Sequence, residues 1–353
     1  MTVGAVERQV DGIALICRSD LDLAELRSQV LRRLRALVPI DAAFFATVDP
    51  VTLLFTSALA EEPLGDVTAL FMENEFGLAD VNKFSTLAGG SRPVNSLDRA
   101  TEGQRANSPR YLEIMAPLSL GDELRAALIT GGRCWGVMCL HRQDAPTGFT
   151  DSELHLVSRL VPHLAEGLRR ALLVQRAGAE PTAEGPGILV LDDQLAVVSC
   201  NRVGEFWLDQ LRFERQPFLD ALPLPVHAVA AQAAFGTGDQ PGGALRVRLQ
   251  TADGHWLVVH ASRLRGGATP QTVVVIEPPR PAELASLFLD AHSITPAQSR
   301  VAALVLQGRS TRQIVNELAI SSNTVQEHLR AVFDKFGVGS RRELVAALLS
   351  RPG

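Results

Sequence analysis

The pattern that decides the fold lies in residues 294–345, which read ITPAQSRVAALVLQGRSTRQIVNELAISSNTVQEHLRAVFDKFGVGSRRELV. Three places in this segment have a hydroxyl residue followed three positions later by Gln or Glu, the spacing of the capping box that opens a helix: Thr295–Gln298, Ser310–Gln313 and Ser340–Glu343. Ser321 can cap another helix alone, and Gly308 and Gly337 fall where the first and third helices must end. The segment is therefore predicted to form four short helices.

Between these caps the apolar residues recur at the spacing of amphipathic helices, so the four helices can share one small core. The connection at 318–321 is only a few residues long, as a helix-turn-helix requires for its second helix to cross the first. On the third helix, Gln326, Glu327 and Arg330 fall off the apolar stripe, near the N-terminal end that such motifs insert in the major groove. These three residues are the candidates for contacting bases.

Positive charge is concentrated at the same end of the chain. Residues 290–353 hold eight Lys or Arg against five Asp or Glu, a net of +3, whereas the whole chain has a net charge of −5. Affinity for DNA depends on positive side chains that neutralise phosphates, and an acidic remainder keeps the other domains off nucleic acid. The predicted phosphate contacts are Arg312, Ser322, Thr324, Lys335 and Arg341.

The segment resembles the DNA-binding domain of LuxR/FixJ-type transcription regulators. The residues that carry the resemblance are TP at 295–296, GRS at 308–310, ISSNTVQEHL at 320–329, KFGV at 335–338 and SRRELV at 340–345. This resemblance implies a sequence-specific regulator of transcription that is not an enzyme and whose partner is double-stranded promoter DNA, with RNA polymerase as a further candidate. A homodimer is expected because one helix-turn-helix buries too little surface for a tight specific complex. A cytoplasmic location without a membrane partner is expected because the first residues lack a secretory-signal pattern and no apolar run is long enough to span a membrane.

The sequence departs from the family pattern at four positions. Gln298 and Arg300 stand where the family favours Glu, Val315 stands where it favours Ala, and Gln326 replaces a common Lys. The resemblance assigns the glutamates to the framework and the lysine to DNA, so these departures alter binding chemistry more than fold.

Three other interpretations compete with this one. A helical bundle that merely packs or dimerises would not need a polar, Arg-bearing face on its third helix. An enzyme would be expected to carry a recognisable site, but the chain has no G-x-S-x-G, P-loop, H-E-x-x-H or G-x-G-x-x-G followed by an acidic residue. A phosphorylated receiver domain needs a late lysine, and the two lysines of the chain, Lys83 and Lys335, do not provide it.

The length of 353 residues predicts two or three domains. Pro-, Gly- and Ala-rich stretches at 176–186 and around 277–281 read as linkers. The chain is therefore expected to be a multidomain α+β protein, with two antiparallel-sheet sensory domains followed by a four-helix DNA-binding domain. The predicted parts are 1–175, a linker at 176–186, 187–276, a linker at 277–289, and 290–353.

Residues 1–175 show the order helix, strand, long middle, hairpin, helix. Two β segments at 124–130 and 134–141 flank Gly131-Gly132-Arg133, which is hairpin chemistry, and TDSE at 150–153 is a capping box for a last helix. This order resembles a GAF domain, and GRCWGV at 132–137 is similar to the late hairpin of that family. A cyclic-nucleotide signature is not expected, because 82–84 lacks the acidic continuation.

Residues 187–276 show two strands, a helical stretch and three more strands, the last three including a turn at Asp253-Gly254. This order resembles a PAS domain, and LD at 191–192 with VSCN at 198–201 is similar to its opening. Both domains would enclose a cavity between the sheet and its crossing helices, where a small-molecule effector could bind.

The candidate cavity walls are Phe71, Phe76, Phe84, Tyr111 and Trp135 in the first domain, and Phe206, Trp207, Phe218, Phe235 and His227 in the second. Each of these residues could equally be plain core, and the upstream domains could instead serve only protein interaction or dimerisation. Four scattered cysteines lack metal-ligand spacing, and no metal is expected. No cofactor can be identified from the sequence.

Overall fold

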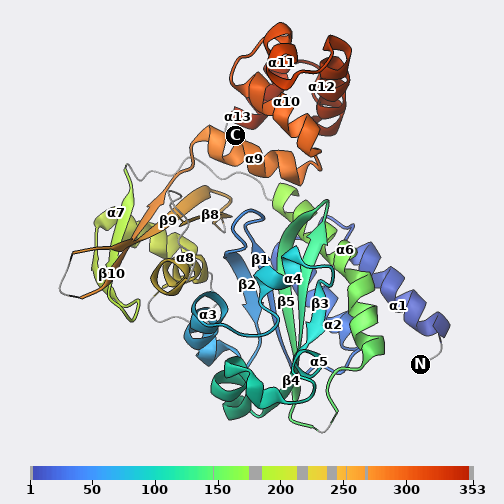
Figure 1. Cartoon of the computed structure of the whole chain (residues 1–353), viewed down its shortest axis with the longest axis vertical. Coiled ribbons are helices and arrows are strands. Elements are labelled where there is room, and N and C mark those ends of the chain that lie inside the picture. The colour runs from blue at the N-terminus through green and yellow to red at the C-terminus, as the bar shows by residue number, and fades with distance from the viewer. Residues whose placement is uncertain are drawn as a thin grey trace. The chain divides into compact units, whose positions relative to one another are not determined.

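The computed structural model divides the chain into two compact units, one ending at Pro278 and the other beginning at Pro279 (Figure 1). The first unit contains two antiparallel sheets, and the described residues of the second form helices, so the protein is a mixed α+β protein as predicted. The residues that the structure describes are 3–145, 147–174, 185–212, 222–236, 245–251, 253–266 and 269–349.

The first sheet has the strand order β2-β1-β5-β4-β3. Its strands are β1 (Ala42–Val48), β2 (Phe55–Ala60), β3 (Val94–Ser96), β4 (Leu120–Thr130) and β5 (Arg133–Gln143). Strands β4 and β5 form the predicted hairpin, in which Thr130 pairs with Arg133 across the two glycines. Both Gly131 and Gly132 have positive φ, which a two-residue turn of this kind requires and which glycine adopts without strain.

One face of this sheet is covered by long helices. They are α1 (Val3–Ile16), α2 (Leu23–Leu34) and α6 (Asp151–Val174), of which α6 contacts β4 and β5 (Figure 1). The helix packs closely because β5 has a glycine at the contact: a Cβ at Gly136 would lie 2.3 Å from Leu168 of α6 and 2.6 Å from the carbonyl oxygen of Ala46. Helix α1 is an element that the sequence pattern did not reveal.

The other face carries the long segment between β2 and β4. This segment forms η1 (Gly65–Val67), α3 (Thr68–Gly77), α4 (Phe84–Gly89), α5 (Leu97–Ala100), η2 (Arg105–Asn107), η3 (Tyr111–Met115) and η4 (Ala116–Leu118). The predicted long middle of the domain is therefore a set of short helices that cross one face of the sheet.

The second sheet has the order β7-β6-β10-β9-β8, which is the same arrangement of successive strands as in the first. Its strands are β6 (Gly187–Leu191), β7 (Val197–Cys200), β8 (Leu245–Gln250), β9 (Trp256–Leu264) and β10 (Gln271–Glu277), with α7 (Arg202–Leu211) and α8 (Leu224–Phe235) between β7 and β8. The predicted element order is present. The assignment to the PAS family stays a prediction.

The two sheets share one hydrophobic core. Helix α8 contacts β8, β9 and β10 of its own sheet and also α3 and β2 of the first. Every residue from Leu224 to Ala231 is buried, as expected of a helix that is apolar all round. At the same junction a Cβ at Gly77 would lie 2.7 Å from Phe235. The predicted boundary at 176–186 lies largely outside the described residues.

Within residues 279–349, the second unit forms five helices: α9 (Pro281–Ala291), α10 (Pro296–Leu306), α11 (Thr311–Leu318), α12 (Ser322–Phe336) and α13 (Arg341–Leu349). The capping boxes at Thr295 and Ser310 and the cap at Ser321 are confirmed, and Gly337 ends α12 in the left-handed conformation. Ser340 accepts from the backbone N–H of Glu343 at 3.2 Å, as the third box predicted.

The prediction that 277–289 is a linker is wrong for its larger part. Pro281 occupies the first position of α9, where its missing N–H costs nothing, and Glu283 accepts from the backbone N–H of Arg280 at 2.8 Å. Ala285 and Leu289 of this helix are buried in the helical core, and α9 packs against α13. The proline-rich run therefore opens a helix that belongs to the C-terminal unit.

Candidate DNA-binding surface and ligand pocket

Helix α12 is held by its apolar side and presents its polar side outward. Val325, Leu329 and Val332 are buried in the core that α12 shares with α10, α11 and α13. Gln326, Glu327 and Arg330, the three predicted base-contacting residues, are exposed. The structure thus places them on one solvent-facing surface within the first three turns of the helix, and their contact with DNA stays a prediction.

Glu327 differs from its two neighbours because it already has a partner. The amide of Asn323, one turn earlier, donates to its carboxylate at 2.9 Å. Among the predicted phosphate contacts nearby, Ser322 is exposed and Thr324 is half-buried, with its hydroxyl 2.9 Å from that of Ser321. The N-terminus of α12 therefore offers backbone N–H groups and hydroxyls together, the combination that binds phosphate at helix ends.

Two of the predicted phosphate-contacting cations also join helices to one another. The ammonium of Lys335 donates to the carbonyl of Ser293 at 2.7 Å and to Gln298 at 3.0 Å. Arg341 donates to the carbonyl of Arg309 at 3.1 Å and to the hydroxyl of Thr311 at 2.9 Å. Both cations therefore stabilise the fold of the unit.

The exposed guanidinium of Arg312, on α11, completes the predicted phosphate-contacting set. Arg312, Gln326 and Arg330 are thus predicted DNA-contacting residues whose side chains are exposed to solvent.

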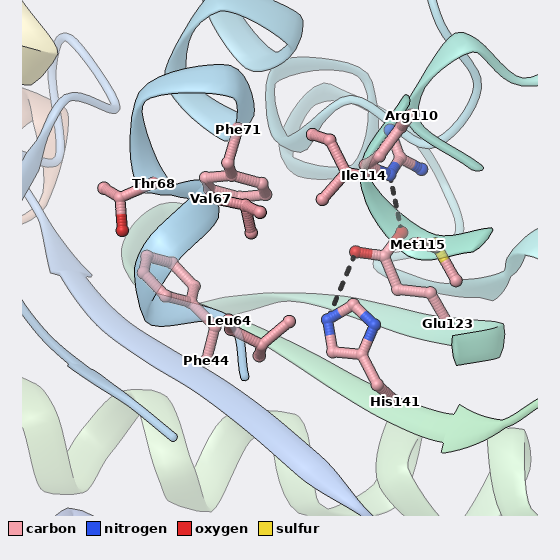
Figure 2. Close-up of a pocket in the computed structure, with 10 residues that line it drawn as sticks. All are labelled: Phe44, Leu64, Val67, Thr68, Phe71, Arg110, Ile114, Met115, Glu123 and His141. Carbon is pink, nitrogen blue, oxygen red and sulfur yellow. Dashed lines mark hydrogen bonds and ion pairs between the residues drawn. The ribbon is translucent and has the colours of Figure 1, made fainter. Parts of the chain in front are cut away.

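The first sheet and the short helices above it enclose a pocket (Figure 2). The space in it that a water-sized molecule can occupy is about 20 Å³. Its walls are Phe44 of β1, Leu64, Val67, Thr68 and Phe71 at η1 and α3, Arg110, Ile114 and Met115 at η3, and Glu123 and His141 of the β4–β5 hairpin. This is the predicted location, between one sheet face and the crossing helices.

A buried carboxylate lies on the floor of the pocket. Glu123 pairs in register with His141, and its side chain is 0% exposed. One oxygen, Oε2, accepts from Nε of Arg110 at 2.8 Å. Burial alone would raise the pKa of Glu123, but the guanidiniums of Arg110 and Arg125 with His141 lower it to about 2, so the group is a carboxylate at neutral pH.

The two arginines beside this carboxylate are tied to other groups as well. Arg110 lies 3.5 Å from Asp80, and Arg125 donates to Glu75 at 2.8 Å while its guanidinium covers the ring of Phe84 at 3.9 Å. Burial lowers the pKa of His141 to about 4, which makes its imidazole neutral at pH 7. The 3.8 Å approach of His141 to Glu123 is therefore not an ion pair at that pH.

Glu123, Cys139 and His141 also have ligand atoms within 4.8 Å of one another, a spacing that a metal ion could use. The electrostatics oppose that use. Nε of Arg125 lies 3.5 Å from the same Oε1 of Glu123 that would bind a cation. Burial also raises the pKa of the Cys139 thiol, so the sulfur keeps its proton and is a poor ligand.

Only Phe71 among the predicted wall residues of the first domain lines this pocket. Phe76 and Phe84 belong to the aromatic cluster around Phe55, with ring centroids 5.5 and 6.1 Å from it. Tyr111 packs against the shared core and Trp135 is buried, but neither is among the pocket walls.

In the second domain, the predicted wall residues lie in or against the core. Trp207 is fully buried, and Phe206 packs on it edge to face at 5.0 Å. His227 is buried in α8, where burial lowers its pKa to about 4. Phe235 packs against Gly77 of the first sheet's helices, and Phe218 lies outside the described residues.

The sequence reasoning missed the polar floor of the pocket. Glu123 and Arg125 alternate with apolar residues in DELRAALIT at 122–130, so both project to the same sheet face. Charged residues at such positions, in a strand that continues with apolar residues, are the signal that could have revealed a buried polar site. Arg110 and Thr68 lie in the irregular middle of the domain, where no period indicates their direction.

Comparison with known proteins agrees with both parts of the chain. Residues 292–348 match the bacterial regulatory proteins of the luxR family, and residues 22–168 match the GAF domain. The spore germination protein GerE of Bacillus subtilis (strain 168) is 36% identical over 62 residues, which make up 18% of this chain and 84% of GerE. The transcriptional regulatory protein DesR of the same organism is 31% identical over 65 residues, 18% of this chain and only 33% of DesR.

Solved structures with weak similarity include a VqmA–ligand–DNA complex of Vibrio cholera. It is 19% identical, the match covers 48% of this chain and 83% of that chain, and the TM-score is 0.23. The GAF domain of an Acinetobacter phosphoenolpyruvate-protein phosphotransferase is 15% identical. The match covers 49% of this chain and 98% of that chain, with a TM-score of 0.34. Similarity this low carries no argument about function. In the described part of the chain, no helix combines the length and the apolar character needed to cross a bilayer.

The family assignment rests on the C-terminal unit, where the caps, the short turn and the exposed face of α12 coincide with a match that covers most of GerE. The chain belongs to the LuxR family of bacterial regulatory proteins and carries a GAF domain ahead of its DNA-binding domain.

Proposed function

We propose that this regulator binds a specific promoter sequence through α12 and that a small molecule in the pocket of the first sheet controls this binding. The observation that carries the proposal is the pocket itself, where apolar walls surround one buried carboxylate. Concave apolar sites with a few fixed polar groups are the usual places where small ligands bind. We place this function in the cytoplasm, where promoter DNA is available.

We further propose that the regulator binds DNA as a homodimer. One helix-turn-helix buries too little surface for a tight specific complex, and a second copy supplies the second half-site. The apolar sides of α13 and α6 are used within the chain: Leu344 and Leu348 of α13 are buried in the helical core, and the apolar side of α6 is buried in the first unit. We therefore place the dimer surface elsewhere on the chain. RNA polymerase remains a proposed further partner.

The DNA-reading surface is tested by substitution and site selection. Arg330→Ala and Gln326→Ala should each cost about 1–3 kcal/mol at the preferred site and relax its base preference. Arg312→Ala should weaken all sequences alike and reduce the slope of affinity against salt. The matched control is Arg342→Ala, an exposed arginine on α13. If the preferred sequence survives all of these substitutions, α12 is not the reading helix.

Ligand control is tested by filling the pocket. Val67→Phe adds a ring to the pocket wall, whereas Val51→Phe adds the same ring at an exposed position outside it and serves as the control. If a ligand in this pocket controls DNA binding, Val67→Phe should abolish the response of a reporter promoter to growth conditions while Val51→Phe retains it. A response that both variants keep would favour the alternative in which the upstream domains serve only protein interaction or dimerisation.

A further inference from the structure

Helix α12 directs a row of polar side chains away from its core. The buried residues of the helix recur at spacings of four and three: Val325, Leu329 and Val332. Glu327 lies two residues from both Val325 and Leu329, a rotation of about 200° at 3.6 residues per turn. Asn323, four residues before Glu327, and Arg330, three residues after it, share its side of the helix, and all three are exposed. This row therefore lies on the side of α12 that is opposite the core.

A carboxylate on that side is unfavourable against DNA unless a base offers it a hydrogen-bond donor. Phosphates repel it, and most groups at the base edges of the major groove are acceptors or methyl groups. The exceptions are the amino groups of adenine and cytosine. Adenine carries the acceptor N7 beside its amino group, whereas the amino group of cytosine is the only hydrogen-bonding group of that base in the major groove. Glu327 is therefore better matched to cytosine than to the other three bases.

The side chain of Asn323 fixes the direction of this carboxylate. Its Nδ2 donates to Oε1 of Glu327 at 2.9 Å, from one turn nearer the start of the helix. In the described part of the chain Glu327 has no further hydrogen-bond or ion-pair partner, so Oε2 is free to accept. The bond also restricts a long side chain that would otherwise lose its rotamer freedom on binding. Part of the entropic cost of recognition is thus removed before DNA binds.

Resting on the proposed function, we propose that Glu327 selects cytosine by accepting from its N4 amino group through Oε2, and that Asn323 is the positioning residue for this contact. Both residues lie in the first two turns of α12, the end of the helix that a helix-turn-helix presents to base edges. Much of the selectivity comes from exclusion, because guanine, adenine and thymine each carry a major-groove acceptor that repels the carboxylate.

The base preference is tested with the full chain by selection from a random DNA library and sequencing of the bound sites. The native chain should prefer cytosine at one position of each half-site by about tenfold or more. Glu327→Gln should abolish that preference and keep the other positions, because an amide can donate to acceptors as well as accept. Asp334→Asn is the matched control, since it removes the same charge from the same exposed side of α12, about two turns later, and should keep the native preference.

The contacted atom is tested with a site in which that cytosine is replaced by 2-pyrimidinone, which lacks the amino group. In a fluorescence anisotropy titration the native chain should lose about tenfold in affinity for this site, whereas Glu327→Ala should bind both sites alike. Equal affinity of the native chain for the two sites would overturn the proposal.

The positioning role of Asn323 has its own readout. Asn323→Ala should reduce the native preference for cytosine about two- to tenfold, because the carboxylate must then be ordered on binding. In the Glu327→Ala background the same substitution should have no further effect at that position, since the two residues act together. If Asn323→Ala instead changes the preference at another position of the site, Asn323 contacts a base itself and is not a positioning residue.

The outcomes separate this proposal from the function on which it rests. A native chain that selects no DNA sequence removes the proposed function and the cytosine contact with it. A selected site whose base preferences are the same in Glu327→Gln removes the cytosine contact and leaves promoter binding standing. Loss of the same preference in Asp334→Asn would assign the effect to charge alone and overturn the proposal. The substituted side chains are all exposed, so equal melting temperatures should confirm that every variant is folded.

Discussion

Removing the carboxylate of Asp49 should destabilise the whole first unit, because this group joins its two sheets. Asp49 follows β1 of the first sheet, and Arg248 lies in β8 of the second. Oδ1 of Asp49 accepts from one terminal nitrogen of Arg248 at 2.7 Å, and Oδ2 accepts from Nε at 2.8 Å and from the backbone N–H at 3.1 Å. The two side chains are 1% and 6% exposed, so solvent cannot replace these bonds.

The expected magnitude follows from that burial. Breaking a buried pair by removing one partner leaves an uncompensated charge, which costs about 3–5 kcal/mol. Asp49→Ala should therefore lower the free energy of unfolding by about that amount, and Asp49→Asn by less, because the amide keeps an acceptor for Arg248 and for the N–H of Val51. Replacing both partners by apolar residues, Asp49→Leu with Arg248→Met, should recover much of the loss.

The assay is urea unfolding of the full chain followed by tryptophan fluorescence, since Trp135 lies in the first sheet and Trp207 and Trp256 in the second domain. Glu7→Gln, which removes an exposed ion pair to Arg159, is the matched control and should leave the transition unchanged. A loss below about 1 kcal/mol in Asp49→Ala, or a loss that only one group of tryptophans detects, would refute the view that the pair holds the two sheets in one cooperative unit.

Three further outcomes are expected. Burial lowers the pKa of His141 from 6.5 to about 4, so the unfolded chain binds more protons than the folded chain between these pH values. The contribution of His141 to the free energy of unfolding should therefore be full above about pH 6.5 and decrease toward pH 4, by up to about 1.4 kcal/mol per pH unit. His141→Gln should flatten part of that slope when thermal unfolding is measured as a function of pH. Gly136→Ala should lower the melting temperature by forcing α6 away from β5, at a cost of about 1–3 kcal/mol in stability. In the double variant Leu168→Ala/Gly136→Ala, the smaller side chain at 168 should recover only the part of this loss that comes from the clash with Leu168. An unchanged melting temperature for Gly136→Ala would contradict the close packing. A fragment of residues 279–353, which keeps α9, should recognise the same DNA sequence as the full chain in a gel-shift assay at low salt, without responding to an effector. A folded fragment that binds no DNA would contradict the assignment of DNA recognition to this unit.

The elements that the sequence predicted well are those set by local chemistry. The caps at Thr295, Ser310 and Ser321 depend on one hydroxyl and the next three residues, and the hairpin at Gly131-Gly132 depends on two positions with positive φ. Such signals are complete within a few residues, so they can be recognised without knowledge of the rest of the fold.

What the sequence did not reveal depends on residues far apart in the chain. Pro281 looks like a linker residue until the core that buries Ala285 and Leu289 is known, because proline favours both loops and first helical turns. On the pocket floor, Arg110 contacts Glu123, which lies thirteen residues later in the chain, beyond an irregular helix and at the start of a strand. The role of α8 was also hidden, since an all-apolar helix does not indicate which surfaces will cover it.

The burial of α8 on all sides has a consequence for how this protein can evolve and be engineered. Because α8 packs on α3 and β2 as well as on its own sheet, neither sheet domain has a finished surface at this junction. Cutting the chain between them would expose the apolar helix α8 on one fragment. On the other fragment it would expose the apolar surface that α8 packs against, including the contact at Gly77. We therefore expect that the two domains can be exchanged only as a pair, and that a chimera that replaces one of them needs new polar residues along α8 to avoid exposing an apolar surface.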